Sequence, residues 1–300
     1  MTREIGRLLT AMVTPFAADG AVDEARCGEL ARALLASGSD GLVLTGTTGE
    51  CPTLNIEEQV RVWSAVRAAV GSDATLIGGA STNSTAESLE MVREGAGAGM
   101  NALMLTVPYY NKPSQEGLVR HFEVLAEATA LPCILYNVPT RTALNMTAET
   151  SVRLAELPNI VGVKEASGDF AQIAEIIERT SDVDFRVWSG NDGDTLPLLA
   201  IGGYGVISVA SHLVGRQIAA MIEAAVGGRA DEAASIHRRL APLVDALFIE
   251  SNPTPLKFAL NDLGFRAGPV RLPLMPPTAA SAAAIRAELA RHAIDLSIAV

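Results

Sequence analysis

Eight short β-rich runs alternate along this chain with longer segments of helical periodicity, and this alternation restricts the fold more than any other feature. The β-rich runs are residues 8–14, 41–46, 75–80, 102–107, 133–138, 160–165, 185–190 and 205–210. Helical segments between them include residues 23–36, 55–70, 84–98, 115–128 and 170–179. Strand and helix repeated in series build a parallel sheet, and eight such units allow the sheet to close on itself. The pattern therefore predicts an α/β fold of the (β/α)8 TIM barrel type.

An open, doubly wound sheet is the alternative with the same alternation. Such sheets often carry a phosphate-binding glycine motif after a strand, but no GxGxxG or GxxxxGK[ST] sequence follows any of the eight runs. The glycine-rich residues 202–205 precede a run instead of following one. After residue 214 the pattern is only helical, over residues 218–226, 231–249, 255–263 and 279–289. We therefore expect a barrel over residues 1–226 and an appended C-terminal helical region over residues 227–300.

Two of the helical segments begin with a recognisable capping sequence. Asn55 is followed three residues later by Glu58, and Ser84 is followed three residues later by Glu87. In a capping box the first side chain accepts a hydrogen bond from the backbone of the fourth residue, whose own side chain reaches back to the first. We expect both segments to start their helices in this way.

Charge and cysteine content exclude several classes of partner and site. The formal net charge of −11 and the isoelectric point near 4.9 do not suit binding to nucleic acid or to an anionic membrane. No apolar run is long enough to predict a membrane span, and residues 1–6 do not resemble a secretory signal. The cysteines lack CxxC spacing and the histidines lack metal-ligand spacing. We therefore expect a cytoplasmic protein with no disulfide framework and no bound metal.

Lys164 lies inside the apolar run 160–166, which has the composition of a fully buried parallel strand. An ammonium group in such a strand loses its hydration, and this loss lowers the lysine pKa. A neutral amine of this kind can attack a carbonyl carbon and form a Schiff base. The alternative is a lysine that extends to solvent or pairs with a carboxylate such as Glu165. The strand by itself leaves both interpretations open.

Reactive side chains gather at the carboxyl ends of the predicted strands, where barrels of this type carry their active sites. They lie in residues 46–50 (GTTGE), 108–113 (PYYNKP), 136–141 (YNVPTR) and 189–192 (SGND), besides Lys164 itself. Three of the four tyrosines of the chain belong to this set, which are Tyr109, Tyr110 and Tyr136. The convergence of rare residues on one rim predicts a functional site there.

Each of these side chains also has a structural interpretation. Thr47 and Thr48 could shape a tight turn, or their hydroxyl and backbone N–H groups could bind a small carboxylate. Arg141 could be a surface charge, or its guanidinium could hold a substrate carboxylate through two hydrogen bonds. Tyr136 could be a core residue, or its phenol could transfer protons beside a Schiff-base lysine.

Five motifs together resemble one known family. They are residues 46–50 (GTTGE), 108–113 (PYYNKP), 136–142 (YNVPTRT), 162–166 (GVKEA) and 252–257 (NPTPLK). This set resembles the dihydrodipicolinate synthases (4-hydroxy-tetrahydrodipicolinate synthases), which belong to the pyruvate-dependent class I aldolases together with N-acetylneuraminate lyase. Two adjacent tyrosines, and an arginine five residues after Tyr136, resemble the synthase branch in particular.

The resemblance implies roles for individual residues. Lys164 would form the Schiff base and Tyr136 would donate and accept protons. Thr47 and Tyr110 would complete a proton relay, with Tyr110 reaching in from a neighbouring subunit. The remaining implied contacts are pyruvate at Thr48 and the backbone of Ile207, a backbone carbonyl at Gly190, and the aldehyde's carboxylate at Arg141.

The activity implied by the resemblance is that of a lyase. It condenses pyruvate with L-aspartate 4-semialdehyde to 4-hydroxy-tetrahydrodipicolinate in the diaminopimelate and lysine biosynthesis pathway. The resemblance also implies a homotetramer that needs no cofactor. Two alternatives stay open: an N-acetylneuraminate lyase or 2-keto-3-deoxy sugar acid aldolase or dehydratase with the same lysine, and a non-catalytic barrel that binds a small molecule.

The chain departs from the family pattern at a few positions. Ala143 stands where a glycine is usual, and Asn191 stands where an aspartate is usual, which leaves the aldehyde preference open. Asn83, Glu87 and Tyr109 fit the family's lysine-feedback pocket. The histidines of lysine-sensitive relatives are replaced in that pocket, by Ile56 and Gln59, so inhibition by lysine is also left open.

Overall fold

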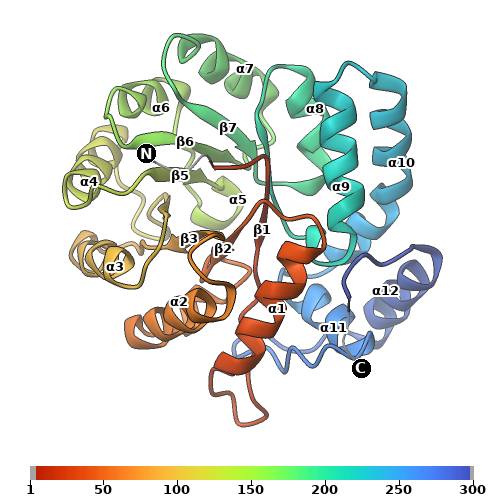
Figure 1. Cartoon of the computed structure of the whole chain (residues 1–300). Helices are drawn as coiled ribbons and strands as arrows, with labels where there is room; N and C mark the ends of the chain where they lie inside the picture. Colours follow the sequence, from red (N-terminus) through yellow and green to blue (C-terminus); the bar gives the residue numbers. More distant parts are fainter. Residues whose placement is uncertain (1–4, 298–300) are drawn as a thin grey trace.

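A closed barrel of eight parallel strands forms the centre of the molecule in the computed structural model, which describes residues 5–297 (Figure 1). Each strand pairs with the next in sequence, and β8 pairs with β1 to close the sheet. The strands are β1 Leu8–Ala11, β2 Gly41–Leu44, β3 Thr75–Gly79, β4 Ala102–Thr106, β5 Cys133–Asn137, β6 Ile160–Glu165, β7 Arg186–Ser189 and β8 Gly205–Ser208. The predicted (β/α)8 TIM barrel is confirmed.

Several strands end earlier than the apolar runs predicted. The first run extends to Thr14, but β1 ends at Ala11, and Met12 makes one more sheet-like hydrogen bond, from its N–H to the carbonyl of Val43 at 2.9 Å. Residues beyond the strand ends stay buried because the loops and the C-terminal helices cover that rim. Hydrophobicity therefore marks burial beyond the last paired residue.

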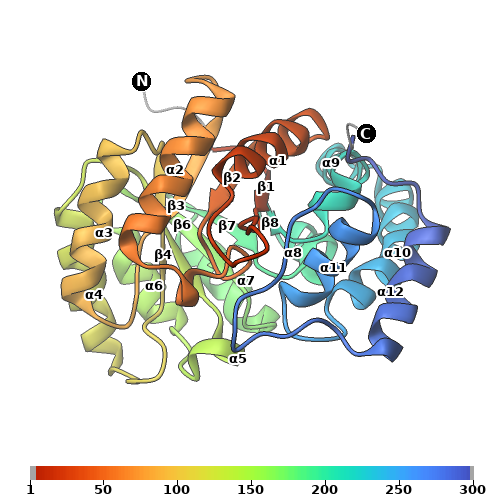
Figure 2. The same ribbon diagram turned by 90° about the horizontal axis from the view of Figure 1, so that it is seen from below.

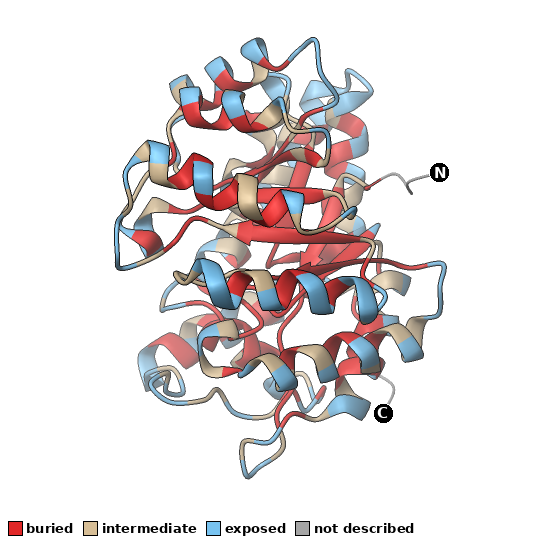
Figure 3. Cartoon of the chain, turned by 90° about the vertical axis from the view of Figure 1, so that its left-hand side faces the viewer, coloured by how far each residue is buried: buried red, intermediate tan, exposed pale blue. Residues whose placement is uncertain are grey.

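Helices surround the barrel and turn their apolar faces inward, whereas the exposed residues lie on their outer faces (Figures 2 and 3). They are α1 Glu24–Ala36, α2 Ile56–Val70, α3 Thr85–Gly97, α4 Gln115–Glu127, α5 Pro139–Thr142, α6 Ala148–Ala155, α7 Phe170–Arg179, α8 Thr195–Ala200 and α9 Ser211–Val226. Helix α9 begins seven residues before the predicted segment, because a non-helical turn at Val214 interrupts its periodicity. Helices α5, α6 and α8 lie outside the predicted segments.

One of the two predicted capping boxes is complete. At α2, the side chain of Asn55 accepts from Glu58 N and the Glu58 carboxylate accepts from Asn55 N. At α3, Ser84 caps Glu87 N, but the Glu87 carboxylate accepts from the hydroxyl of Thr82. The N–H of Ser84 donates to that same Thr82 hydroxyl at 3.0 Å. The second capping box is therefore wrong in its return contact, because a closer hydroxyl satisfies the N-cap.

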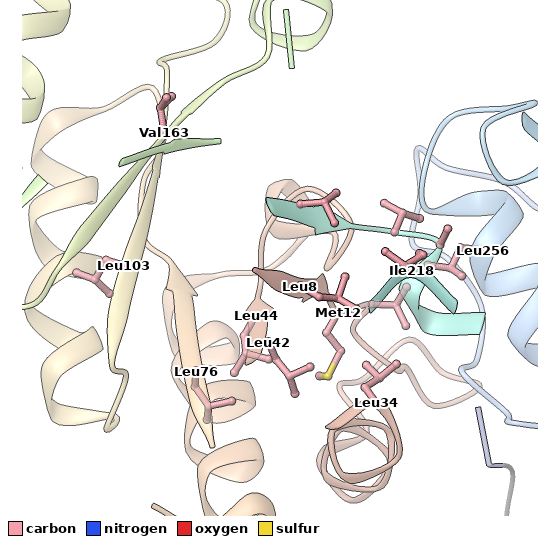
Figure 4. Close-up of a cluster of buried hydrophobic side chains, with 14 of the residues drawn as sticks. Leu8, Met12, Leu34, Leu42, Leu44, Leu76, Leu103, Val163, Ile218 and Leu256 are labelled. Atoms are coloured by element: carbon pink, nitrogen blue, oxygen red, sulfur yellow. The ribbon is translucent and has the colours of Figure 1, made fainter. Parts of the chain in front are cut away.

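Two apolar layers form on opposite sides of the sheet, because successive strand residues face opposite ways. Leu42 and Leu44 of β2 pack outward in the layer between strands and helices, beside Leu8 and Leu34 (Figure 4). The inner layer fills the barrel and includes Val43, Ile77, Met104, Trp188 and Ile207. In β6, Val163 belongs to the outer layer. Its neighbour Lys164 therefore faces into the barrel.

The remaining helices are α10 Ala230–Leu247, α11 Thr254–Asp262 and α12 Ala279–Arg291, close to the predicted segments. They lie together on one side of the barrel, next to α9 (Figure 1). Residues 1–4 and 298–300, at the outer ends of the two expected regions, lie outside the described part of the chain. Within residues 5–297, no helix is both long enough and apolar enough to cross a membrane.

The outer layer predicts a clear difference between two leucines. Leu42 is fully buried between β2 and the helices, whereas Leu272 is 75% exposed. We expect Leu42→Ala to lower the free energy of unfolding by about 2–5 kcal/mol, because it removes buried methyl groups and leaves a cavity. Leu272→Ala is the matched control, with an expected change within about 0.5 kcal/mol. Urea denaturation followed by circular dichroism measures both, and equal values would contradict the assigned layers.

Candidate active site

Lys164 projects from β6 into the barrel and is 5% exposed. In the sheet it lies between Tyr136 of β5 and Trp188 of β7, and its Nζ lies 4.1 Å from the centroid of the Tyr136 ring. Burial lowers the pKa of Lys164 from 10.5 to about 7; the negative charge of Asp192 opposes the shift and the positive charge of Arg141 adds to it. A large fraction of this amine is therefore uncharged at neutral pH.

The alternative interpretation, in which Lys164 reaches solvent or pairs with Glu165, is wrong. Glu165 is the next residue of β6 and therefore faces the other side of the sheet. Its carboxylate accepts hydrogen bonds from the side chains of Asn137 and Gln172 and from the N–H of Ser167. These contacts hold the carboxyl end of β6 on the face of the sheet opposite to Lys164.

Tyr136 lies beside Lys164 on the inner face of β5 and is 5% exposed. Burial raises the pKa of its phenol to about 12, although the positive charge of Arg141 and a hydrogen bond with the side chain of Thr47 act in the opposite direction. The phenol therefore keeps its proton at neutral pH and can donate it. The structure thus joins Lys164, Tyr136 and Thr47, which are far apart in sequence.

Thr47 and Thr48 lie in a tight turn that follows β2. The turn runs between two non-glycine residues in the left-handed region, Thr45 with φ 49° and Glu50 with φ 58°. The N–H of Glu50 donates to the carbonyl of Thr47 at 3.0 Å. The hydroxyl of Thr48 accepts a hydrogen bond from Nδ2 of Asn252 at 2.9 Å. The turn is therefore tied both to itself and to the C-terminal region.

Arg141 lies on the short helix α5, directly after β5. Its side chain is exposed at the rim, and its Nη2 donates to the carbonyl of Asn252 at 3.2 Å. Its charge acts on both Lys164 and Tyr136. Ala143 ends α5 in the left-handed region, with φ 57°. A glycine would adopt this conformation at lower cost, by roughly 1 kcal/mol, so the alanine that departs from the family pattern occupies a strained position.

Gly190 directly follows β7, and Ile207 lies in the neighbouring strand β8. A Cβ atom at Gly190 would lie 2.6 Å from the Cβ of Ala166 and 3.3 Å from Cε of Lys164, so glycine leaves the space beside the amine open. Ile207 is fully buried in β8 on the inner face. Asn191 donates from Nδ2 to the carboxylate of Asp194 at 2.8 Å, which holds it in its own turn.

Sequence reasoning assigned no role to Asp192, although its segment stood at the predicted rim. Its buried carboxylate accepts hydrogen bonds from the hydroxyl of Ser208 and from the N–H groups of Val209 and Ala210. Burial raises the pKa of Asp192, and these hydrogen bonds and the charge of Lys164 oppose the shift. Asp192 joins the turn after β7 to the end of β8 and supplies a negative charge near the amine. The only sequence feature that indicated a role for Asp192 was its position at the end of a predicted strand.

Tyr110 stands apart from the other predicted site residues. Its side chain is 88% exposed and its φ is 72°, and among the described residues it has no hydrogen bond to Thr47 or Tyr136. Tyr109 is half-buried and forms a hydrogen bond with the backbone of Asn83, and the negative charge of Glu87 helps to raise its pKa. Asn83, Glu87 and Tyr109 therefore lie together. Gln59 is buried, and Ile56, which lies three residues before it on α2, is half-buried.

The histidines and carboxylates of the described chain do not assemble a metal site: within residues 5–297 no three His, Cys, Asp or Glu side chains are grouped closely enough to hold an ion. The chemistry that the site offers is that of a buried amine, a protonated phenol, two threonine hydroxyls and a guanidinium around one barrel mouth. Such a set can bind a carboxylate, attack a ketone and move protons.

Comparisons with known proteins identify the family of the chain. The model of the dihydrodipicolinate synthetase family matches residues 4–292. The chain is 56% identical over 296 residues to a 4-hydroxy-tetrahydrodipicolinate synthase of Dehalococcoides mccartyi, with 99% of both chains covered. It is 55% identical over 273 residues to that of Moorella thermoacetica, covering 91% of this chain and 93% of the relative.

Solved structures give the same result. Dihydrodipicolinate synthase from Cyanidioschyzon merolae, solved with lysine bound, matches with a TM-score of 0.94 and 46% identity over 95% of this chain and 97% of that one. The enzyme from Bacillus anthracis matches with a TM-score of 0.93 and 42% identity, over 96% and 98% of the two chains. This chain therefore belongs to the dihydrodipicolinate synthetase family.

Proposed function

We propose that this protein is a lyase that condenses pyruvate with L-aspartate 4-semialdehyde to 4-hydroxy-tetrahydrodipicolinate, on the route to diaminopimelate and lysine. One observation carries the proposal: the amine of Lys164 is buried, has a pKa lowered to about 7 and faces the Tyr136 ring at 4.1 Å. The family and the synthase names of its relatives supply the reaction that such an amine serves.

In the first half of the reaction, the Lys164 amine attacks the keto carbon of pyruvate. The keto oxygen leaves as water, and an iminium links Nζ to the substrate. The Thr48 hydroxyl and the backbone of Ile207 hold the pyruvate carboxylate. The iminium withdraws electrons, so a methyl proton passes to Tyr136, which has already given its own proton to the departing water, and an enamine forms. Covalent catalysis of this kind divides a difficult step into easier ones, and the lysine supplies the electron sink that an organic cofactor would provide elsewhere.

In the second half, the enamine carbon bonds to the aldehyde carbon of the second substrate. The aldehyde oxygen becomes an alkoxide and takes a proton from Tyr136, whose phenol is still protonated at neutral pH because burial raises its pKa to about 12. Thr47 and Tyr110 relay a replacement proton to Tyr136. Positioned proton transfer of this kind contributes roughly 10²- to 10⁴-fold to the rate. Arg141 holds the aldehyde's carboxylate, and the backbone carbonyl of Gly190 lies near the reacting atoms. Water hydrolyses the iminium, which releases the adduct and frees Lys164, and the amino group of the adduct closes the ring with loss of water.

Tyr110 enters this scheme from a neighbouring subunit. Its exposed side chain on a left-handed backbone suits a residue that completes a partner's site instead of its own. We therefore propose a homotetramer in the cytoplasm that acts on small molecules and not on nucleic acid or membranes. The division into a catalytic barrel over residues 1–226 and a C-terminal helical region over residues 227–300 is also part of the proposal.

The two alternatives are not favoured. The relatives carry the synthase name, which speaks against a sialic acid or sugar-acid aldolase. A non-catalytic binding barrel would have no physical need for a buried amine beside a phenol, because burying the amine costs hydration. A direct comparison of turnover with aspartate semialdehyde plus pyruvate and with 2-keto-3-deoxy sugar acids separates the first alternative from the proposal.

The Schiff base is tested by reduction with borohydride in the presence of pyruvate. We expect mass spectrometry to find a pyruvate-derived adduct on Lys164, because that amine is desolvated and inside the barrel. Lys112 is the internal control, since it is exposed to solvent. Lys164→Met should abolish the adduct, and labelling of Lys112 alone would contradict the mechanism.

The lowered pKa of Lys164 predicts the pH dependence of imine formation. The attacking form is the neutral amine, which predominates above the pKa of the folded protein, about 7. The rate of cyanoborohydride-trapped adduct formation should therefore rise as the pH increases through about 7 and level off above it. A rate that continues to rise toward the ordinary lysine value of 10.5 would show that the amine is solvated.

Subunit complementation tests the origin of Tyr110. Tyr110→Phe and Lys164→Met should each lower kcat by at least about 10²-fold, since each removes a proton relay member or the nucleophile. If Tyr110 serves its partner, a co-expressed hybrid dimer pairs an intact Lys164 with an intact Tyr110 in one of two sites. The mixture should recover about a quarter of the wild-type activity. No recovery would place Tyr110 in the site of its own chain, whereas full activity of Tyr110→Phe by itself would place Tyr110 outside the relay.

A further inference from the structure

A second buried lysine lies outside the proposed mechanism. Lys257 of α11 forms an ion pair with Glu50, with 2.6 Å between Nζ and Oε1, and the two side chains are only 2% and 0% exposed. Both residues belong to motifs that the sequence singled out, yet neither touches a substrate in the scheme above. A buried ion pair is costly to desolvate, and apolar side chains of similar size stabilise a fold at least as well. The pair therefore calls for a role beyond stability.

We propose that Lys257 is a positioning residue for the Thr47–Thr48 turn and acts on it through Glu50. This inference rests on the proposed function, because it concerns the same proton relay. Lys257 holds the Glu50 carboxylate in one place, Glu50 closes the turn after β2, and the turn directs the hydroxyl of Thr47 to Tyr136.

The Glu50 carboxylate is held at both oxygens. Oε1 meets Nζ of Lys257, and Oε2 accepts a hydrogen bond from the N–H of Arg271 at 2.9 Å. The backbone of Glu50 has φ 58°, a left-handed conformation that a residue with a Cβ atom rarely adopts unless its surroundings impose it. In this conformation its N–H reaches the carbonyl of Thr47 at 3.0 Å. The ion pair thus acts at the point where the turn is strained.

The same end of α11 also holds Thr48. The N–H of Lys257 donates to the carbonyl of Pro253 at 2.9 Å, so residues 252–257 form one connected turn. Asn252 at the start of that turn donates from Nδ2 to the Thr48 hydroxyl at 2.9 Å and accepts from Arg141 with its carbonyl at 3.2 Å. Residues 252–257 therefore contact the turn twice, through Asn252 to Thr48 and through Lys257 to Glu50.

The Lys257 ammonium is fully engaged in its buried position. Besides Glu50, it donates to the carbonyl of Pro269 at 2.9 Å and lies 3.9 Å from the centroid of the Phe16 ring. Burial lowers the pKa of Lys257 to about 8, and the charge of Glu50 opposes the shift. Three fixed contacts leave the ammonium one orientation, which is what a positioning role requires.

A double-mutant cycle with Thr47 tests the proposal. In the wild-type background, Lys257→Met should lower kcat by at least about tenfold, with a smaller effect on the KM for pyruvate. In the Thr47→Val background, the same substitution should lower kcat by no more than about threefold, because the hydroxyl it positions is already gone. Equal losses in the two backgrounds would show that Lys257 does not act through Thr47 and would overturn the proposal.

Arg286→Met is the matched control. Arg286 also forms an ion pair with α11, to Asp262 at 2.8 Å, but at an exposed site remote from the turn. It should leave kcat within about twofold of the wild type. All variants are assayed below their thermal midpoints, and borohydride trapping of pyruvate on Lys164 should persist in Lys257→Met because the nucleophile is untouched. A kcat for Lys257→Met within twofold of this control would overturn the proposal.

Glu50→Gln provides the second route if Lys257→Met does not fold. It keeps the shape of the side chain and an oxygen for the N–H of Arg271 but removes the charge that fixes the ammonium. The same dependence on Thr47 is expected, and its absence would overturn the proposal. Failure of the proposed function would look different, because the wild-type protein itself would then show no condensation activity and no adduct on Lys164.

Discussion

The proposed chemistry depends above all on a single amine, that of Lys164, which the barrel keeps out of water. Lys164 alternates with Val163 along β6, so closing the sheet forces its side chain into the apolar interior of the barrel. Lost hydration lowers its pKa to about 7, and the charge of Asp192 keeps the shift from going further. The same enclosure keeps the phenol of Tyr136 protonated. One physical effect, desolvation, therefore places a largely neutral amine beside a protonated phenol.

The rest of the site depends on how strand ends are joined across the mouth of the barrel. Asp192 links the end of β7 to the end of β8, and Glu165 holds the end of β6 to neighbouring loops from behind. The C-terminal helices do more than cover the barrel, since Asn252 and Lys257 contact the turn that carries Thr47 and Thr48. The C-terminal helices are therefore in direct contact with the turn that follows β2.

Much of the fold was predictable because burial and periodicity are local properties of the sequence. The eight strands, the helix that begins after Asn55 and the buried strand that carries Lys164 were all predicted. Two errors share a cause, which is that local patterns do not identify distant or competing partners. Apolar residues after Ala11 are buried by the covering segments without being strand, and Thr82 replaces the contact expected between Glu87 and Ser84. The early start of α9 has a different cause, because the non-helical backbone at Val214 interrupts the helical periodicity.

The sequence by itself determined the alternation that closes the barrel, the family, and the identity of the residues at the strand ends. Each of these depends only on which residues occur along the chain and how they are spaced. Tertiary structure alone decided which of them meet. It brought Asp192 near the amine, set Lys257 against Glu50 across more than 200 positions of the chain, and left Tyr110 exposed. Such meetings depend on how the closed sheet and its covering helices fold back on each other, which no local pattern encodes.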